Sequence, residues 1–152
     1  MDRSLIDEYV AGGEKLKSAY AGLTRDQLMA HPVPNTWSLH QIAVHMMDSD
    51  LIGSDRMKRI ACMDKPLLIG YDETGFSNLP GSDDIDAFEA IDIFARNRAL
   101  TGKVLYKLPS ESFQRYGIHS EKGKVTLEEM VKGYIQHLEG HLQWVAKKRA
   151  MV

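Results

Sequence analysis

The sequence predicts an all-α protein, an antiparallel four-helix bundle formed by a single domain of 152 residues. Four segments, each about 20 residues long, repeat their apolar side chains at helical spacing. Two of these segments begin with a capping box, the Ser/Thr-x-x-Glu/Gln pattern typical of helix starts. A length of 152 residues fits one domain with a core large enough to fold without a disulfide or a structural metal. Amphipathic helices of this kind bury their apolar faces against one another, which favours a bundle.

The first helix is expected from about Ser4 to Leu23, because apolar residues recur along one stripe of that segment. A Pro-rich connection, residues 24–37, follows and contains one short helical turn at Asp26–Met29. The second helix is expected from Ser38 to about Ala61. Its start is marked by a capping box in which the Ser38 hydroxyl can accept from the amide of Gln41.

The third helix is expected from about Asp83 to Leu108, with Pro109 just after its end. Its apolar stripe is expected to hold Ile85, Phe88, Ile91 and Ala95. The fourth helix begins with the second capping box, at Thr126, and runs to about Arg149. Lysine and arginine side chains crowd its last turn, where cations interact favourably with the helix dipole.

Two longer connections separate these helices. Residues 62–82 form a long loop, and residues 110–125 are expected to form a short hairpin or an irregular excursion. Loops longer than about 12–15 residues in a compact domain are often functional. The 62–82 loop is therefore a candidate lid or pocket wall.

Composition excludes several classes of function. A net charge of −2 and an isoelectric point near 6.3 provide no electrostatic footprint for nucleic acid. No stretch approaches the roughly 18 apolar residues of a membrane span. The first residues are acidic and lack the apolar core of a secretory signal, and the single Cys62 fits a reducing compartment. We therefore expect a cytoplasmic protein that does not bind membranes or nucleic acid.

Three histidines are candidate metal ligands. His137 and His141 lie four residues apart on the fourth helix, so their side chains stand one above the other and can converge on one ion. His45 lies on or beside an apolar face of the second helix. Facing helices of a bundle approach to about 8–10 Å, which allows one histidine to meet two others. Three neutral imidazoles leave an open position on Zn²⁺ or another borderline divalent ion, where bound water or a thiol is acidified.

Simpler interpretations stand beside this one. An inward-pointing histidine is more often a hydrogen-bonded core residue than a metal ligand, and His-x-x-x-His pairs also arise by chance. His40 is expected to be a surface or capping residue and His31 a loop residue. His119 is expected to be structural, although it could reach a pocket. The sequence shows no Gly-rich phosphate loop and no His-Glu-x-x-His motif.

Several segments together resemble the DinB-like superfamily, which includes the YfiT-type metal-dependent hydrolases. Trp37-Ser38 followed by His45 in His-Met-Met-Asp-Ser-Asp resembles its Trp-Ser … His-Leu-x-Asp pattern. Pro32-Val33-Pro34 resembles its Pro-rich lead-in, and Pro66-Leu67 through Tyr71-Asp72 resembles its Pro-x-Leu … Tyr-Asp segment. The helix that ends in His137-x-x-x-His141 is similar to the last helix of that family. The resemblance covers roughly residues 20–149 in the same order.

This resemblance implies a four-helix bundle whose metal ligands map to His45, His137 and His141. It also implies Zn²⁺ or Ni²⁺ as the metal ion, a small-molecule substrate and a homodimer. Family members of known activity are similar to thiol S-transferases and thiol-dependent isomerases that use low-molecular-weight thiols. One departure is Phe76, which stands where the family often has Trp after the Tyr-Asp segment.

The leading hypothesis is an enzyme whose three-histidine site activates a water or a low-molecular-weight thiol, as a hydrolase or a thiol S-transferase. Trp37 and Tyr71 could line the substrate pocket, and Trp37 could instead anchor the start of the second helix. Asp48 or Asp50 could orient a ligand or contact substrate, but a solvated helix face is the simpler expectation for both acids. Two alternatives remain: a non-catalytic metal-binding or ligand-binding stress-response bundle, and a purely structural helical domain.

Overall fold

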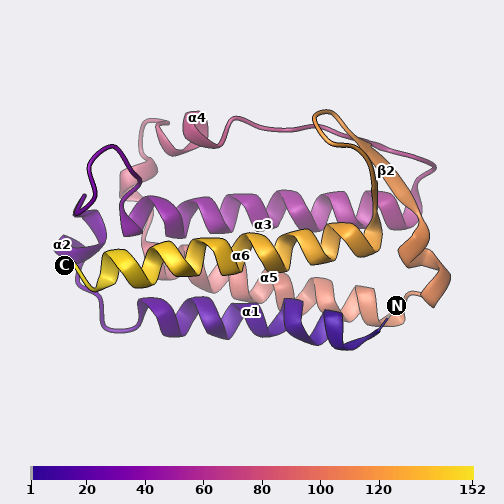
Figure 1. Cartoon of the computed structure of the whole chain (residues 1–152), viewed down its shortest axis with the longest axis horizontal. Helices are drawn as coiled ribbons and strands as arrows, with labels where there is room; N and C mark the ends of the chain where they lie inside the picture. Colours follow the sequence, from indigo (N-terminus) through magenta and orange to yellow (C-terminus); the bar gives the residue numbers. More distant parts are fainter. Residues whose placement is uncertain (1) are drawn as a thin grey trace.

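Four long helices make up most of the protein (Figure 1): α1 (Ser4–Tyr20), α3 (Leu39–Cys62), α5 (Ala87–Lys107) and α6 (Leu127–Arg149). The computed structural model describes residues 2–152. Both predicted capping boxes are present, one from Ser38 to Gln41 and one from Thr126 to Glu129. The predicted four-helix bundle is confirmed. None of the helices among residues 2–152 is long and apolar enough to cross a membrane.

Two helix ends differ from the expected positions, each for a local reason. α1 ends at Tyr20 because the chain turns at Gly22, which has a φ of +77°. α5 begins at Ala87 because the carboxylate of Asp86 caps it, accepting from the amides of Phe88 and Glu89 at 2.8 and 3.0 Å. The expected apolar stripe of this helix is only partly right, since Phe88 is 41% exposed. Ile91 is buried as expected, together with Phe94, Arg98 and Leu105.

The helices do not alternate strictly in direction. α3 and α5 are neighbours that run parallel. His40, at the start of α3, bonds to Ile85 just before α5, and Asp50, in the middle of α3, pairs with Arg98 in the middle of α5. α1 and α6 are also parallel neighbours, joined by the ion pair between Lys15 and Glu139. The pairs α1–α5 and α3–α6 are antiparallel (Figure 1). The chain therefore needs a long return connection between α3 and α5.

This connection, residues 63–86, travels the length of the bundle over one side of it (Figure 1). It contains three short elements that the sequence did not predict: β1 (Leu67–Leu68), α4 (Glu73–Ser77) and η1 (Ser82–Asp84). β1 pairs in parallel with β2 (Tyr116–His119), which pairs antiparallel with β3 (Gly123–Thr126) in the register Ile118 to Lys124. We call residues 63–77 the crossing segment. The small sheet holds its first part against the end of the bundle.

The remaining connections agree with the sequence more closely. The predicted hairpin within residues 110–125 is confirmed, formed by β2 and β3 after a 3₁₀ turn, η2 (Ser110–Gln114). The short helical turn before α3 is α2 (Arg25–Met29), which is capped by Thr24.

The core has two apolar clusters, one in each half of the bundle, with a buried ion pair between them. Arg98 is 0% and Asp50 is 1% exposed, and Nε of Arg98 donates to Asp50 at 2.8 Å. The same guanidinium donates to the backbone carbonyls of Tyr9 and Tyr134 at 3.1 and 2.9 Å. Arg98, on α5, thus binds groups from the three other long helices. The expectation of a solvated helix face is wrong for Asp50.

Candidate metal centre

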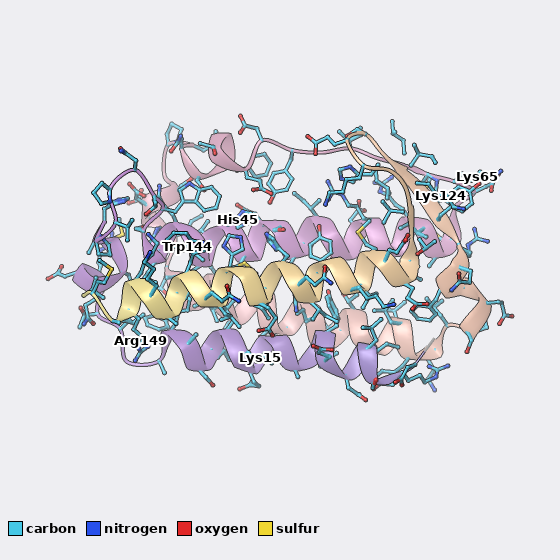
Figure 2. All side chains as sticks on the ribbon, viewed as in Figure 1. Lys15, His45, Lys65, Lys124, Trp144 and Arg149 are labelled. Atoms are coloured by element: carbon cyan, nitrogen blue, oxygen red, sulfur yellow. The ribbon has the colours of Figure 1, made fainter. Side chains whose placement is uncertain are left out.

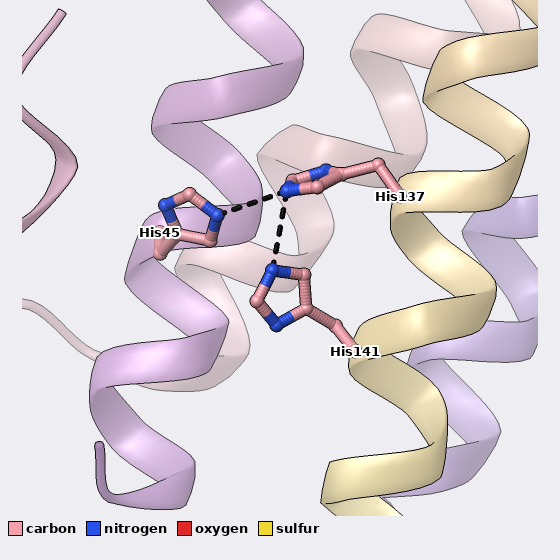
Figure 3. Close-up of side chains that lie close together, drawn as sticks. All are labelled: His45, His137 and His141. Carbon is pink, nitrogen blue, oxygen red and sulfur yellow. Dashed lines mark hydrogen bonds between the residues drawn. The ribbon is translucent and has the colours of Figure 1, made fainter. Parts of the chain in front are cut away.

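Three histidine rings meet where α3 faces α6 (Figure 3), and Figure 2 marks the place of one of them, His45. The Nε2 atom of His137 lies 3.1 Å from Nε2 of His45 and 3.1 Å from Nε2 of His141. The three histidines each offer one nitrogen, and these nitrogens all lie within 4.8 Å of one another. The structure therefore brings together the three residues that the sequence singled out as metal ligands.

Local structure fixes the positions of these rings. His137 and His141 are one helical turn apart on α6, and His45 projects from the buried face of α3, where it is 2% exposed. Trp37, just before α3, packs against the rings: its ring is parallel to that of His141 within 6° and lies 4.8 Å from His45 between centroids. The indole of Trp37 therefore lies against two of the three rings.

Burial keeps the three imidazoles neutral at physiological pH. Loss of solvation lowers the pKa of His45 to about 4 and of His141 to about 4. Burial also lowers the pKa of His137 to about 3, and repulsion from the two neighbouring rings adds to this effect. A neutral imidazole keeps a lone pair for a metal ion, so the site is prepared to bind one.

Hydrogen bonding alone does not account for the arrangement. Nε2 of His137 contacts two other nitrogens at 3.1 Å, but an imidazole nitrogen carries either one hydrogen or one in-plane lone pair. It can therefore satisfy one of these contacts and not both. Nitrogens bound to a single tetrahedral zinc ion, with Zn–N bonds of about 2.0–2.1 Å, lie roughly 3.3 Å apart. The donor set and its spacing fit a borderline divalent ion.

The second nitrogens of His45 and His137 have different surroundings. The hydroxyl of Tyr71 lies 3.5 Å from Nδ1 of His45, at the outer limit of a hydrogen bond. When this hydroxyl accepts from Nδ1–H, the ring has the tautomer that leaves Nε2 free for a metal. Nδ1 of His137 is buried and has no hydrogen-bond partner within residues 2–152.

A pocket of about 520 Å³ adjoins the cluster, and His137 forms part of its inner wall. It is bounded by α3, α6, the crossing segment and the β2–β3 hairpin. The ring of Tyr134 packs directly against α3 at Gly53, where an added Cβ would come within 2.3 Å of that ring. The polar lining includes Ser49, Arg56, Tyr71, His119, Lys122 and Tyr134.

The two predicted substrate-contacting residues have different places. Tyr71 lies on the crossing segment and lines the pocket beside His45. Burial raises its pKa to about 12, and hydrogen bonding with Ser49 opposes part of the rise. Trp37 packs against the histidine rings and one of the apolar clusters, and it does not line the pocket.

The two candidate acids, Asp48 and Asp50, also have different surroundings. Asp50 is occupied by Arg98 and by Asn97, which donates to it at 2.7 Å, so both of its carboxylate oxygens are engaged within the bundle. Asp48 is half-buried, and burial raises its pKa. Its charge helps to raise the pKa of Tyr71, which places Asp48 at the edge of the candidate site.

Two other histidines are buried; His40 differs from its expected surface or capping role, and His119 reaches the pocket, as the sequence allowed. His40 is 2% exposed and not at the surface, because its Nε2 bonds to the carbonyl oxygen of Ile85 at 2.7 Å. His119 is 6% exposed and reaches the pocket from β2.

The sequence analysis missed Arg56, Ser49 and Tyr134 as pocket residues. A signal for two of them was available, because Ser49 and Arg56 follow His45 by four and eleven positions. At about 100° per residue, both fall within roughly 40° of His45 on α3.

Comparison with known proteins now places the chain in a family. The model of the DinB superfamily matches residues 8–145. This chain belongs to the DinB superfamily. The family that the sequence motifs resemble is thereby confirmed.

Among curated proteins, this DinB superfamily chain is similar to YfiT of Bacillus subtilis strain 168, a probable metal-dependent hydrolase. The two are 25% identical over 134 residues, which cover 88% of this chain and 75% of YfiT. A solved structure of YfiT, described as a four-helix bundle of unusual topology, matches with a TM-score of 0.90 and 24% identity. The match covers 95% of this chain and 83% of the YfiT chain, and it supports the fold.

Proposed function

We propose that this DinB superfamily protein binds one divalent metal ion, Zn²⁺ or Ni²⁺, through His45, His137 and His141. The ion would serve an enzyme that activates a water or a low-molecular-weight thiol, as a hydrolase or a thiol S-transferase. The observation that carries the proposal is the contact of one imidazole nitrogen with two others at 3.1 Å, among rings that are neutral at pH 7. The similarity to a probable metal-dependent hydrolase supports it.

An ion held by three imidazoles supplies Lewis acidity, which lowers the pKa of a water or thiol that coordinates to it toward neutrality. The protein's own groups have separate tasks. Tyr71 and Tyr134 keep their phenolic protons at neutral pH, because burial raises the pKa of both. They can therefore donate hydrogen bonds to a substrate oxygen but do not act as bases. Ser49 lines the same pocket and is close enough to both hydroxyls to oppose the rise in their pKa.

The first experiment measures metal content by elemental analysis of untagged protein, as purified and after incubation with Zn²⁺ or Ni²⁺. We expect about one equivalent per chain in the wild type and none in a His137→Ala, His141→Ala double variant. The matched control is His31→Ala, because His31 is exposed in the loop before α3. Wild-type protein without metal under all conditions would refute the proposal, as would full retention of metal in the double variant.

The second experiment separates the two chemistries. Metal-loaded protein is assayed with ester and amide substrates, and with low-molecular-weight thiols plus an electrophile, each against the double variant. Turnover lost in the double variant identifies the reaction. One equivalent of metal without turnover in either assay would favour the non-catalytic metal-binding alternative.

We also propose a homodimer in the cytoplasm that acts on a small molecule and binds neither nucleic acid nor membranes. The homodimer rests on the family resemblance, and the cytoplasmic location rests on the single, unpaired Cys62. Light scattering coupled to size-exclusion chromatography tests the first, and a mass near 17.1 kDa would contradict it.

A further inference from the structure

One buried cation in the pocket wall has no anion beside it. Arg56 is 8% exposed and lies well inside α3, away from the carbonyl groups at its end. Its guanidinium donates to two neutral oxygens, the hydroxyl of Tyr134 at 3.3 Å and the carbonyl of Ile69 at 2.5 Å. Within residues 2–152, no carboxylate lies within ion-pair distance of it. A guanidinium has five N–H donors, so three remain available.

The other buried cations of the described chain are compensated. Arg98 is paired with Asp50 at 2.8 Å. Lys148 lies in the last turn of α6, where the carbonyl groups of the helix end favour a cation, and its ammonium donates to Thr36. Buried charges in proteins are normally paired, because an unpaired charge away from water is costly. Arg56 differs from both in facing a pocket.

Two further donors point to the same space. His119 is 6% exposed, and its Nδ1 accepts a hydrogen bond from the amide of Glu121 at 3.2 Å. The proton of the neutral ring is therefore on Nε2, which is free to donate to a ligand. Lys122, at the turn of the hairpin, lines the same pocket. Arg56 and Lys122 are both close enough to lower the pKa of His119, after the effect of burial.

None of the remaining charged residues of the lining pairs with Arg56 or Lys122. Glu129 accepts two hydrogen bonds from Thr126, at 2.8 and 2.9 Å. Glu73 is exposed on the crossing segment, and its charge acts on Tyr71 and on His141. Lys132 pairs with Glu128 at 2.7 Å. Lys124 places its ammonium over the ring of Tyr116, 4.5 Å from the centroid.

We infer that Arg56, His119 and Lys122 form a subsite for an oxyanion, a carboxylate or a phosphate group, carried by the substrate. This inference rests on the proposed function in one respect, because the pocket that holds the subsite also opens onto His137. The hydrogen bond from Arg56 to Tyr134 and the 6.2 Å between the Tyr134 and His137 rings place the guanidinium within about 12 Å of the latter ring. A substrate with its anionic group no further than that from its reacting group would span both sites.

The test titrates the full chain with succinate and with inorganic phosphate, in the metal-free and in the zinc-loaded form. Binding is measured by calorimetry and by NMR of the arginine side-chain N–H signals. Uncharged succinamide is the control ligand. We expect the anions to bind the metal-free wild type and Arg56→Met to weaken binding about tenfold or more, since charged hydrogen bonds to an anion are strong. The matched control is Arg59→Met, because Arg59 is an exposed arginine on the same helix that pairs with Asp55.

A second variant is needed because Arg56 also has a structural role: it donates a hydrogen bond to the carbonyl of Ile69 in the crossing segment. Lys122→Ala removes an exposed side chain at the hairpin turn and is expected to leave the fold intact while weakening anion binding by about threefold. Stronger binding of succinate than of phosphate would identify a carboxylate substrate, and the reverse a phosphate.

Several results would overturn the subsite. These are the absence of binding by either anion, equal binding of succinamide, and unchanged affinity in both Arg56→Met and Lys122→Ala. Anion binding that is lost in the His137→Ala, His141→Ala variant would place the anion at the histidines instead. Metal content is measured separately, so a failure of the metal proposal and a failure of the subsite give different results.

Discussion

Acidification is expected to destabilise the metal-free protein strongly through the three clustered histidines. Their pKa values lie at about 4, 3 and 4 in the folded state, for His45, His137 and His141. In the unfolded chain each is about 6.5. Between pH 6.5 and 4 the unfolded state therefore binds more protons than the folded state, with an excess that approaches three near pH 5. Stability is fully present above pH 6.5 and is lost as the pH falls.

The magnitude follows from proton linkage. Three extra protons correspond to a slope of about 4 kcal/mol per pH unit within that window. From pH 7 to pH 5 the loss amounts to about 2 kcal/mol per histidine, or about 6 kcal/mol in total. Small domains are stable by about 5–15 kcal/mol, so this loss removes a large part of the stability of the metal-free protein at pH 5.

The assay is urea unfolding of chelator-treated protein at pH 7, 6 and 5, followed by circular dichroism. The reference is a His45→Gln, His137→Gln, His141→Gln variant, which lacks these titrations but shares the other ionisable groups. We expect the wild type to lose stability far more steeply than the variant. Parallel pH profiles of the two proteins would refute the reasoning. Saturating Zn²⁺ should raise the unfolding free energy of the wild type alone at pH 7.

Three further perturbations test the framework around the site. Arg98→Met should lower the unfolding free energy by about 3–5 kcal/mol, because it leaves the buried Asp50 carboxylate without its counter-ion, and Arg98→Met with Asp50→Leu should recover part of that loss in urea unfolding. Gly53→Ala should cost about 1–3 kcal/mol, since the new Cβ must displace the ring of Tyr134, and a melting temperature equal to the wild type would contradict this packing. Thr126→Ala should cost about 1 kcal/mol by removing a helix cap, whereas Thr126→Ser should retain most of the stability in the same denaturation assay.

The sequence predicts the features of this protein that depend on local order. The two capping boxes and the apolar periodicity place the long helices, because both signals act within a few residues. The meeting of His45 with His137 and His141 was also predictable. Two of the rings lie one turn apart on the same face of a helix, and the third lies on an inward face of a neighbouring helix.

Features that depend on distant partners were not predictable in this way. Asp50 is buried only because Arg98, 48 positions away, comes to meet it. β1 is two residues long and exists because the hairpin lies beside it, so no periodic signal marks it. The subsite residue Arg56 has an ordinary helical context, and its missing counter-ion is visible only when the whole pocket wall is assembled.

The parallel arrangement of α3 and α5 has a consequence for how such a protein can diversify. α3 has 24 residues and is about 36 Å long, a distance that an extended chain covers with roughly 11 residues. The connection from 63 to 86 has roughly twice that length, so about half of it is surplus to the span. That surplus carries Tyr71 and Glu73 over the pocket while contributing few residues to the two apolar clusters. Substitutions and insertions there can reshape what the pocket admits while the bundle below keeps its three imidazoles in place.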